Sequence, residues 1–241
     1  MNEPQKAPTS SGLATVLNTI IAPKEAFESI RTAPTWGWAF IIAELLVLIG
    51  SIIVLPAIQH AFDFSWAAHI STNPRLSQMS ADQLARAKSF AEAIVNIAPV
   101  FALLSVPIIM FVYTIIMLLF NALGRGSASF EKLWAATANI FIPGAGLGSI
   151  VLGIIVLVRG AATLNAPNAI QSLMPSLAML APAAPVKLQA FLSKIDPFTI
   201  WTAVLIVLAM LITANVPKLH AWLTGLVILL FPALLAAAFA R

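Results

Sequence analysis

The stretch Leu219–Ala240, LHAWLTGLVILLFPALLAAAFA, decides the fold class of this chain. It contains no Asp, Glu, Lys or Arg, Trp222 lies near its start, and Arg241 follows its end. The hydrocarbon core of a bilayer is about 30 Å thick, and an α-helix needs about 20 apolar residues to cross it. The stretch meets this requirement and predicts a transmembrane helix.

Four further runs have a similar length and character, and most of them begin near a tryptophan. Indole rings favour the headgroup boundary of a membrane, so this placement supports the same interpretation. The runs lack the strict alternation over about ten residues that a transmembrane β-barrel requires. We therefore predict an all-α fold, a polytopic membrane helical bundle with five transmembrane helices: Trp36–Gln59, Ile97–Ala122, Leu133–Val158, Pro197–Asn215 and Leu219–Ala240.

The composition agrees with a membrane protein. Hydrophobic residues make up 60% of the chain and charged residues 9%, whereas soluble domains carry about a quarter charged residues. The chain has no cysteine, which excludes disulfides and thiolate chemistry. The net charge of +4 is spread without a basic run, so we expect no nucleic-acid partner.

The part before the first span divides into two segments. Residues 1–10 are polar and predict a mobile tail, residues 11–35 predict an amphipathic interfacial segment, and residues 36–241 form the transmembrane domain. No cleaved signal peptide is expected, and the first span would act as its own insertion signal.

Two short amphipathic helices are predicted within residues 11–35, separated at Pro23, which suits the first turn of a helix. An apolar face on one side of a short helix is typical of helices that lie in the membrane interface. Packing of this face on the protein's own surface is an equal alternative. The expected apolar faces are Leu13, Val16, Leu17, Ile20 and Ile21 in the first helix, and Ala26, Phe27 and Ile30 in the second.

The orientation follows from the short connections, which weigh more than long ones in the positive-inside rule. The turn at Leu123–Lys132 and the turn at Val216–Lys218 are both short and basic. They predict a cytoplasmic N-terminus, and we expect a protein that is integral to a bacterial inner membrane.

Glu44 is the only formally charged side chain well inside a predicted span. Ionisable groups at this depth are costly and are often functional, so Glu44 is a candidate proton or cation site. The structural alternative, which we favour, is a protonated or hydrogen-bonded carboxyl within the bundle.

The third span contains Asn139, Pro143, Gly144 and Gly148. Proline removes a backbone hydrogen bond, and the two glycines have the spacing that permits close helix approach. Some transporters bind ions and substrates at such a broken helix. A kinked packing helix uses the same residues, and we favour that interpretation.

Nothing in the sequence specifies an enzyme. The three histidines are isolated from one another and from carboxylates at metal-binding spacing, so no metal site is expected. The serine-hydrolase, zinc-protease and P-loop motifs are absent, and no catalytic residue or cofactor is predicted.

Three stretches resemble the Yip family, the Ypt/Rab-interacting membrane proteins, and in particular its bacterial branch. The first runs from Ile20 to Trp36 and contains Pro23 and Phe27; the second runs from Ser129 to Trp134 and is followed by Pro143. The third enters the fourth span with Asp196, Phe198 and Trp201 and is similar to the family's most recognisable motif.

The resemblance implies five membrane helices, a cytoplasmic N-terminus and no catalytic residues. Eukaryotic members bind small GTPases and sibling proteins in vesicle trafficking. The soluble arm of this chain is short, so GTPase binding is not carried over.

We accordingly predict a non-enzymatic scaffold or interaction protein that acts on membrane organisation. Its expected partners are the lipid bilayer and other membrane proteins or further copies of itself. The alternative is a small permease or transporter subunit that uses Glu44 and the broken Pro/Gly helix.

Overall fold

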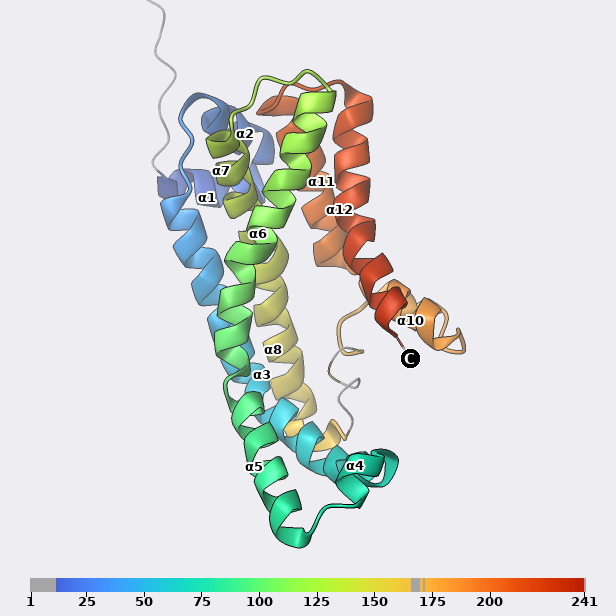
Figure 1. Ribbon diagram of the computed structural model, residues 1–241. Coiled ribbons are helices and arrows are strands. Elements are labelled where there is room, and N and C mark those ends of the chain that lie inside the picture. The colour runs from blue at the N-terminus through green and yellow to red at the C-terminus, as the bar shows by residue number, and fades with distance from the viewer. Residues whose placement is uncertain (1–11, 166–169, 171, 241) are drawn as a thin grey trace, which may run out of the picture. The chain divides into compact units, whose positions relative to one another are not determined.

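The computed structural model describes residues 12–165, 170 and 172–240, and these contain helices and connecting turns with no β-strand (Figure 1). Four helical stretches are long and apolar enough to cross a membrane: Gly37–Thr72, Ala98–Leu123, Phe130–Arg159 and Lys218–Phe239. A fifth crossing results if the bent pair Val186–Leu192 and Pro197–Ile212 counts as one span. The prediction of an all-α polytopic bundle is confirmed, with four to five spanning helices. The predicted tail 1–10 lies outside the described residues.

The first spanning helix, α3 (Gly37–Thr72), continues well beyond its predicted end at Gln59. Its 36 residues correspond to about 54 Å at the helical rise, so it exceeds the hydrocarbon thickness. The residues that follow the predicted end of the span are therefore helical as far as Thr72. The residues after His60 contain no helix breaker until Asn73–Pro74, where the Asn73 side chain caps the short helix α4 (Pro74–Ser77).

The second span is preceded by its own capped helix. In α5 (Ala81–Asn96), the Ser80 hydroxyl accepts from the Gln83 N–H while the Gln83 side chain accepts from the Ser80 N–H. This reciprocal capping satisfies two N–H groups that the helix leaves unpaired. The chain then continues into α6 (Ala98–Leu123).

The regular α-helix of the third span is interrupted at Pro143, as the sequence predicts. Helix α7 (Phe130–Phe141) passes into a π-helical turn, η1 (Ile142–Gly146), and then into α8 (Leu147–Arg159). The Pro143 nitrogen cannot donate to the helix ladder, and an insertion of one wider turn accommodates this loss.

The fourth span is the shortest. Helix α11 (Pro197–Ile212) has 16 residues, or about 24 Å at the helical rise. It follows α10 (Val186–Leu192) at a bend of 55°. The predicted end at Asn215 is too late, because Thr213 to Val216 form a turn in which Asn215 has a positive φ of 56°. Helix α12 (Lys218–Phe239) then matches the predicted fifth span within one residue at each end.

The chain forms two compact units, and most of the spans contribute to both. The first unit comprises Met1–Ala43, Ile108–Ala145 and Phe198–Pro232, and the second comprises Glu44–Pro107, Gly146–Pro197 and Ala233–Arg241. In the sequence, three of the crossings from one unit to the other fall at Pro107, Pro197 and Pro232, and another falls at the end of η1.

The first unit contains the larger hydrophobic core. Fully buried side chains from α2 (Pro23–Thr32), α6, α7, α11 and α12 form it, and they include Phe27, Met117, Leu133, Leu205 and Ala221. Two short turns close one end of this unit: the Ser127 N–H donates to the Ala214 carbonyl over 2.9 Å, and the Asn121 side chain bonds the Ala128 backbone.

The second unit has a smaller core and a tight helix pair. Val54, Ala57, Ala61 and Val156 pack with residues of the 160–173 connection. A Cβ atom at Gly50 would lie 2.6 Å from the Ser149 backbone, so glycine is required for α3 and α8 to approach this closely.

Candidate functional site

The N-terminal arm consists of two helices: one buries its apolar side chains, and the other leaves most of them exposed. Helix α1 (Gly12–Ile21) and α2 pack on each other and both pack on α7 (Figure 1). In α2, Ala26, Phe27 and Ile30 are fully buried in the core of the first unit. Of the two alternatives that the sequence left open, α2 follows the one in which its apolar face packs on the protein itself.

Helix α1 buries a different face from the one that its hydrophobic pattern suggests. Thr15, Val16 and Thr19 are buried, and the Thr19 hydroxyl donates to the Thr15 carbonyl over 2.9 Å. Leu17 and Ile21 are 62% and 77% exposed, and Leu13 and Ile20 are also exposed. Val16, which was expected on the same face as the leucines and isoleucines, is instead buried beside Thr15 and Thr19. The Thr19 hydroxyl can be buried there because it is satisfied within the helix.

Two residues of the family motif hold this arm in place. Pro23 is the first residue of α2, as predicted, and Phe27 inserts its ring into the core. The Thr213 hydroxyl, in the turn after α11, donates to the Phe27 carbonyl over 3.0 Å and is itself buried. Asp196 directly precedes α11, whose first turns carry the half-buried Phe198 and the 39%-exposed Trp201. Pro23 and Phe27, together with Thr213, therefore attach the arm to the core of the first unit.

Asn139 connects α7 to the segment that leads into α3. It is fully buried, and its Nδ2 donates to the Ala135 carbonyl over 2.8 Å and to the Thr35 carbonyl over 3.0 Å. Its Oδ1 and the Thr35 Oγ1 are both buried and have no hydrogen-bond partner among the described residues. Buried polar atoms normally have a partner, so this junction has spare hydrogen-bonding capacity.

The π-helical turn contains the predicted Pro143 and Gly144. A Cβ atom at Gly144 would lie 2.3 Å from the Thr202 Oγ1 of α11, so a larger residue there would require the Thr202 side chain to move. Gly148 lies in the first turn of α8, within the second unit. The packing interpretation is supported at Gly144, and the role of Gly148 stays a prediction.

Glu44 lies on α3 and is half-buried. Its Oε2 atom is buried and has no hydrogen-bond partner among the described residues. Neither of two cavities, one between α3 and α5 and one beside the first turn of α3, is lined by Glu44 or Asn139.

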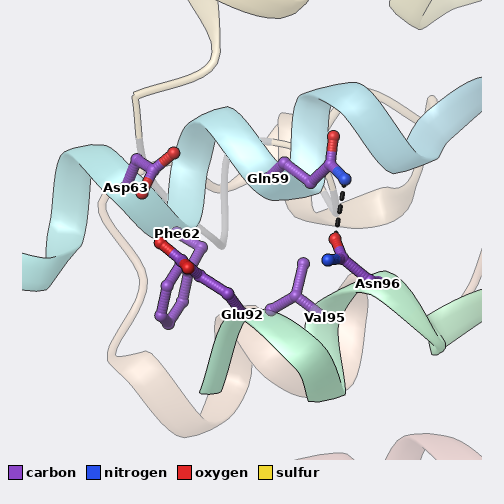
Figure 2. A pocket seen from close by; sticks show the side chains of 6 residues that line it. All are labelled: Gln59, Phe62, Asp63, Glu92, Val95 and Asn96. Atoms are coloured by element: carbon purple, nitrogen blue, oxygen red, sulfur yellow. Dashed lines mark hydrogen bonds between the residues drawn. The ribbon is translucent and has the colours of Figure 1, made fainter. Parts of the chain in front are cut away.

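A polar cavity of about 220 Å³ lies between α3 and α5 in the second unit (Figure 2). The Gln59 Nε2 donates to the Asn96 Oδ1 over 2.8 Å at one end. Asp63 and Glu92 lie at the other end, and the Lys88 ammonium bridges them at 2.9 and 3.2 Å. These hydrogen bonds, first the one to Asp63 and then the one to Glu92, raise the pKa of Lys88. Sequence reasoning missed this cavity because the predicted first span ended at Gln59.

A row of aromatic rings follows one surface of the first unit. Neighbouring ring centroids are 6.1–6.4 Å apart from Phe111 to Phe130, Trp134, Trp36 and Phe40. Trp36, Phe111 and Phe130 are each more than 40% exposed. Edge-to-face and offset contacts of this kind hold the rings in place, so the row is an ordered apolar surface.

The described residues contain no group of three His, Asp or Glu side chains that could hold a metal ion.

The apolar helices define a polytopic α-helical membrane protein, and its N-terminal arm is attached to the core of the first unit. The family model of the Yip1 domain matches residues 17–240, nearly the whole chain, and the protein belongs to this family. No curated protein and no solved structure matches it.

Proposed function

We propose that this protein is a non-enzymatic membrane scaffold, which organises the bilayer around it and binds other membrane proteins or further copies of itself. The observation that carries this proposal is the orientation of α1. Its exposed Leu17 and Ile21 lie on a helix whose opposite face is buried. An apolar helix face that the described part of the chain leaves exposed is suited to the boundary between headgroups and acyl chains.

The arm is attached to the core of the first unit. Phe27 and Ile30 bury α2 in the core, and α1 packs on α2 and α7. A helix attached in this way would insert at a constant angle, and shallow insertion of apolar side chains spreads the headgroups of one leaflet. The aromatic row from Phe111 to Phe40 would be a second binding surface, for other proteins in the membrane.

Reconstitution into liposomes tests the effect on the bilayer. The double variant L17D/I21D removes the exposed apolar face of α1 and leaves its buried face unchanged. We expect the wild-type protein to produce smaller vesicles than protein-free lipid, as measured by electron cryo-microscopy, and the double variant to restore the protein-free diameter. Met79→Asp, which changes a 37%-exposed apolar side chain after α4, is the matched control. Equal diameters for wild type and double variant would contradict the proposal.

Partner binding needs a separate experiment. Cross-linking in native membranes, followed by purification of the full chain and mass spectrometry, should recover a reproducible set of membrane proteins or cross-linked copies of this chain. The set should shrink when Phe111 and Phe130 are both changed to Ala. Recovery of the same proteins with the double alanine variant would argue against the aromatic row as the binding surface.

The proposal places the N-terminus in the cytoplasm and the protein in a bacterial inner membrane. The two short connections that carry Arg125, Lys132 and Lys218 support this orientation, because short basic connections weigh most in the positive-inside rule. Reporter fusions at Met1 and Arg241 should report opposite compartments if there are five spans. The same compartment for both fusions would exclude that number.

A permease is the second candidate, and the unpartnered Oε2 of Glu44 is the observation in its favour. A carboxyl that carries a proton or cation would lose this ability in Glu44→Gln, while the fold would survive. We expect the variant to behave as the wild type does. A cation-dependent flux in proteoliposomes that the variant abolishes would favour the permease.

A further inference from the structure

A compact hairpin, residues 176–195, lies directly before the fourth span in the second unit. It consists of the short 3-10 helix η3 (Leu177–Leu180) and α10, which pack on each other. The Leu177 N–H donates to the Ile195 carbonyl over 3.0 Å and joins the two ends of the hairpin. The Gln189 side chain donates to the Ala181 carbonyl, in the turn between the two helices. The hairpin is therefore a folded element of the chain.

The hairpin leaves most of its large apolar side chains exposed. Leu180 is 81% exposed, and Met179 and Val186 are each 60% exposed. Leu177 and Leu188 are exposed as well. Single exposed apolar side chains are normal, but their concentration in one short folded element marks an interaction surface.

The position of the hairpin in the chain identifies what covers this surface. The hairpin is followed by Asp196 and then by Pro197, the first residue of α11, and none of the 16 residues of α11 is charged. At about 24 Å, α11 is about 6 Å shorter than the hydrocarbon core. The chain after α11 is the turn with the buried Thr213, followed by the basic Lys218, whereas the chain before it is the apolar hairpin. The hairpin thus lies where the bilayer begins and can fill the missing thickness.

The backbone of the hairpin is suited to an environment with little water. The N–H groups of Met179, Ala181 and Ala184 donate to carbonyls within the hairpin. Pro182 and Pro185 have no N–H to pair. Unpaired backbone groups are costly among acyl chains, so this pairing permits shallow insertion. The bend of 55° between α10 and α11 turns α10 away from the direction of the span.

The charges of the hairpin indicate the lipid class. Residues 176–195 contain Lys187 and Lys194 and no Asp or Glu. Lys187 is exposed in the first turn of α10, between the exposed Val186 and Leu188. A lysine in this setting can extend its ammonium to the headgroups while its apolar neighbours lie among the acyl chains. Basic residues at the membrane surface attract anionic lipids.

We propose that residues 176–195 lie at the boundary between headgroups and acyl chains in the leaflet where α11 begins, and that Lys187 binds the phosphate of an anionic phospholipid there. Met179, Leu180 and Val186 insert among the upper acyl segments. This inference is independent of the scaffold proposal, because α1 precedes the first span and takes no part in the hairpin.

Fluorescence quenching in proteoliposomes tests the depth of the hairpin. The chain has no cysteine, so Leu180→Cys in the full chain can carry a single nitrobenzoxadiazole label. Gln78→Cys, at an exposed polar position of the same unit, is the matched control. Lipids with a nitroxide on the acyl chain should quench the label at position 180 and barely affect the label at position 78. Iodide, present on both sides of the bilayer, should do the reverse.

Quenching by iodide that is as strong at position 180 as at position 78 would overturn the membrane location. The exposed surface of the hairpin would then be available to a water-soluble protein. The melting temperature of each labelled variant, compared with that of the wild type, checks that the variant is folded.

The lipid class is tested with the label at position 180 in mixed vesicles of phosphatidylcholine and phosphatidylglycerol, with the nitroxide on one lipid or the other. Spin-labelled phosphatidylglycerol should show an apparent association constant about fivefold higher, as expected for one lysine at an anionic surface. Lys187→Gln should remove this preference, and Arg86→Gln, at an exposed position of α5, should leave it unchanged. Equal quenching by the two lipids before Lys187 is changed, or an unchanged preference in Lys187→Gln, would overturn the lipid assignment.

Discussion

Helices α1 and α2 follow each other in the sequence, have 10 residues each, and differ in what covers their apolar side chains. The apolar face of α2 is enclosed by α7, α11 and the turn that carries Thr213, whereas the leucines and isoleucines of α1 are left uncovered. The comparison shows that an amphipathic pattern identifies a helix and its apolar face but not the surface that will cover it. In this protein α2 anchors the arm in the core, and α1 exposes apolar side chains.

The largest effect is expected for the anchor. Phe27→Ala removes a fully buried ring from the core and should lower the free energy of unfolding by about 3–5 kcal/mol. Leu17→Ala, on the exposed face of α1, is the matched truncation and should change it by less than about 0.5 kcal/mol in detergent. Thermal or denaturant unfolding in the same detergent measures both. A similar decrease in the free energy of unfolding for the two variants would contradict the conclusion that α2 is anchored in the core and α1 is not.

A smaller effect is expected for the hydrogen bond that ties the anchor to the turn after α11. Thr213→Val keeps the shape of the side chain and removes the donor to the Phe27 carbonyl. It should destabilise the protein by about 1–3 kcal/mol, because that carbonyl remains buried. Thr32→Val removes an exposed hydroxyl that bonds only within α2 and serves as the control. An unchanged melting temperature for Thr213→Val would show that the bond does not anchor α2.

The smallest effect on stability is expected at the ion pairs of Lys88 with Asp63 and Glu92 in the second unit. Exposed ion pairs contribute little to the free energy of unfolding. The pKa of Lys88 is raised above its ordinary value of 10.5 by its hydrogen bonds to Asp63 and Glu92. A raised lysine pKa gives a stabilisation that is fully present below that ordinary value and is lost as the pH rises through the folded-state pKa. The difference in melting temperature between wild type and Lys88→Met should therefore be small and constant from pH 6 to 9 and should be lost only as the pH rises through the raised pKa of Lys88. A difference that changes with pH between 6 and 9 would contradict this assignment.

The sequence predicted the class of fold and most helix positions because the signals for these are local. The uncharged run 219–240 and the proline of the third span are each visible in one continuous stretch of sequence, and each lies where it was predicted. The family resemblance carried by Pro23, Phe27 and Trp201 was likewise confirmed by the match to the Yip1 domain.

Features that depend on contacts between distant segments could not be predicted in this way. The extension of α3 to Thr72 places Asp63 beside Lys88, and neither residue carries a local sign of the other. Thr35 and Asn139 are separated by more than 100 positions, and only the fold shows that they meet. The buried threonine face of α1 also differs from its hydrophobic pattern, because threonine hydroxyls can bond to the helix backbone and pack as small side chains.

Spin labels on single cysteines test the difference between α1 and α2 most directly, and the native chain has no cysteine to interfere. Labels at positions 17 and 21 of α1 and at positions 24 and 28 of α2, which are exposed in the structure, would be measured in liposomes by electron paramagnetic resonance. We predict that the α1 labels are relaxed mainly by oxygen, which concentrates in the membrane, and the α2 labels mainly by a water-soluble nickel complex. Relaxation of the α1 labels by the nickel complex, to the same degree as those of α2, would contradict the account.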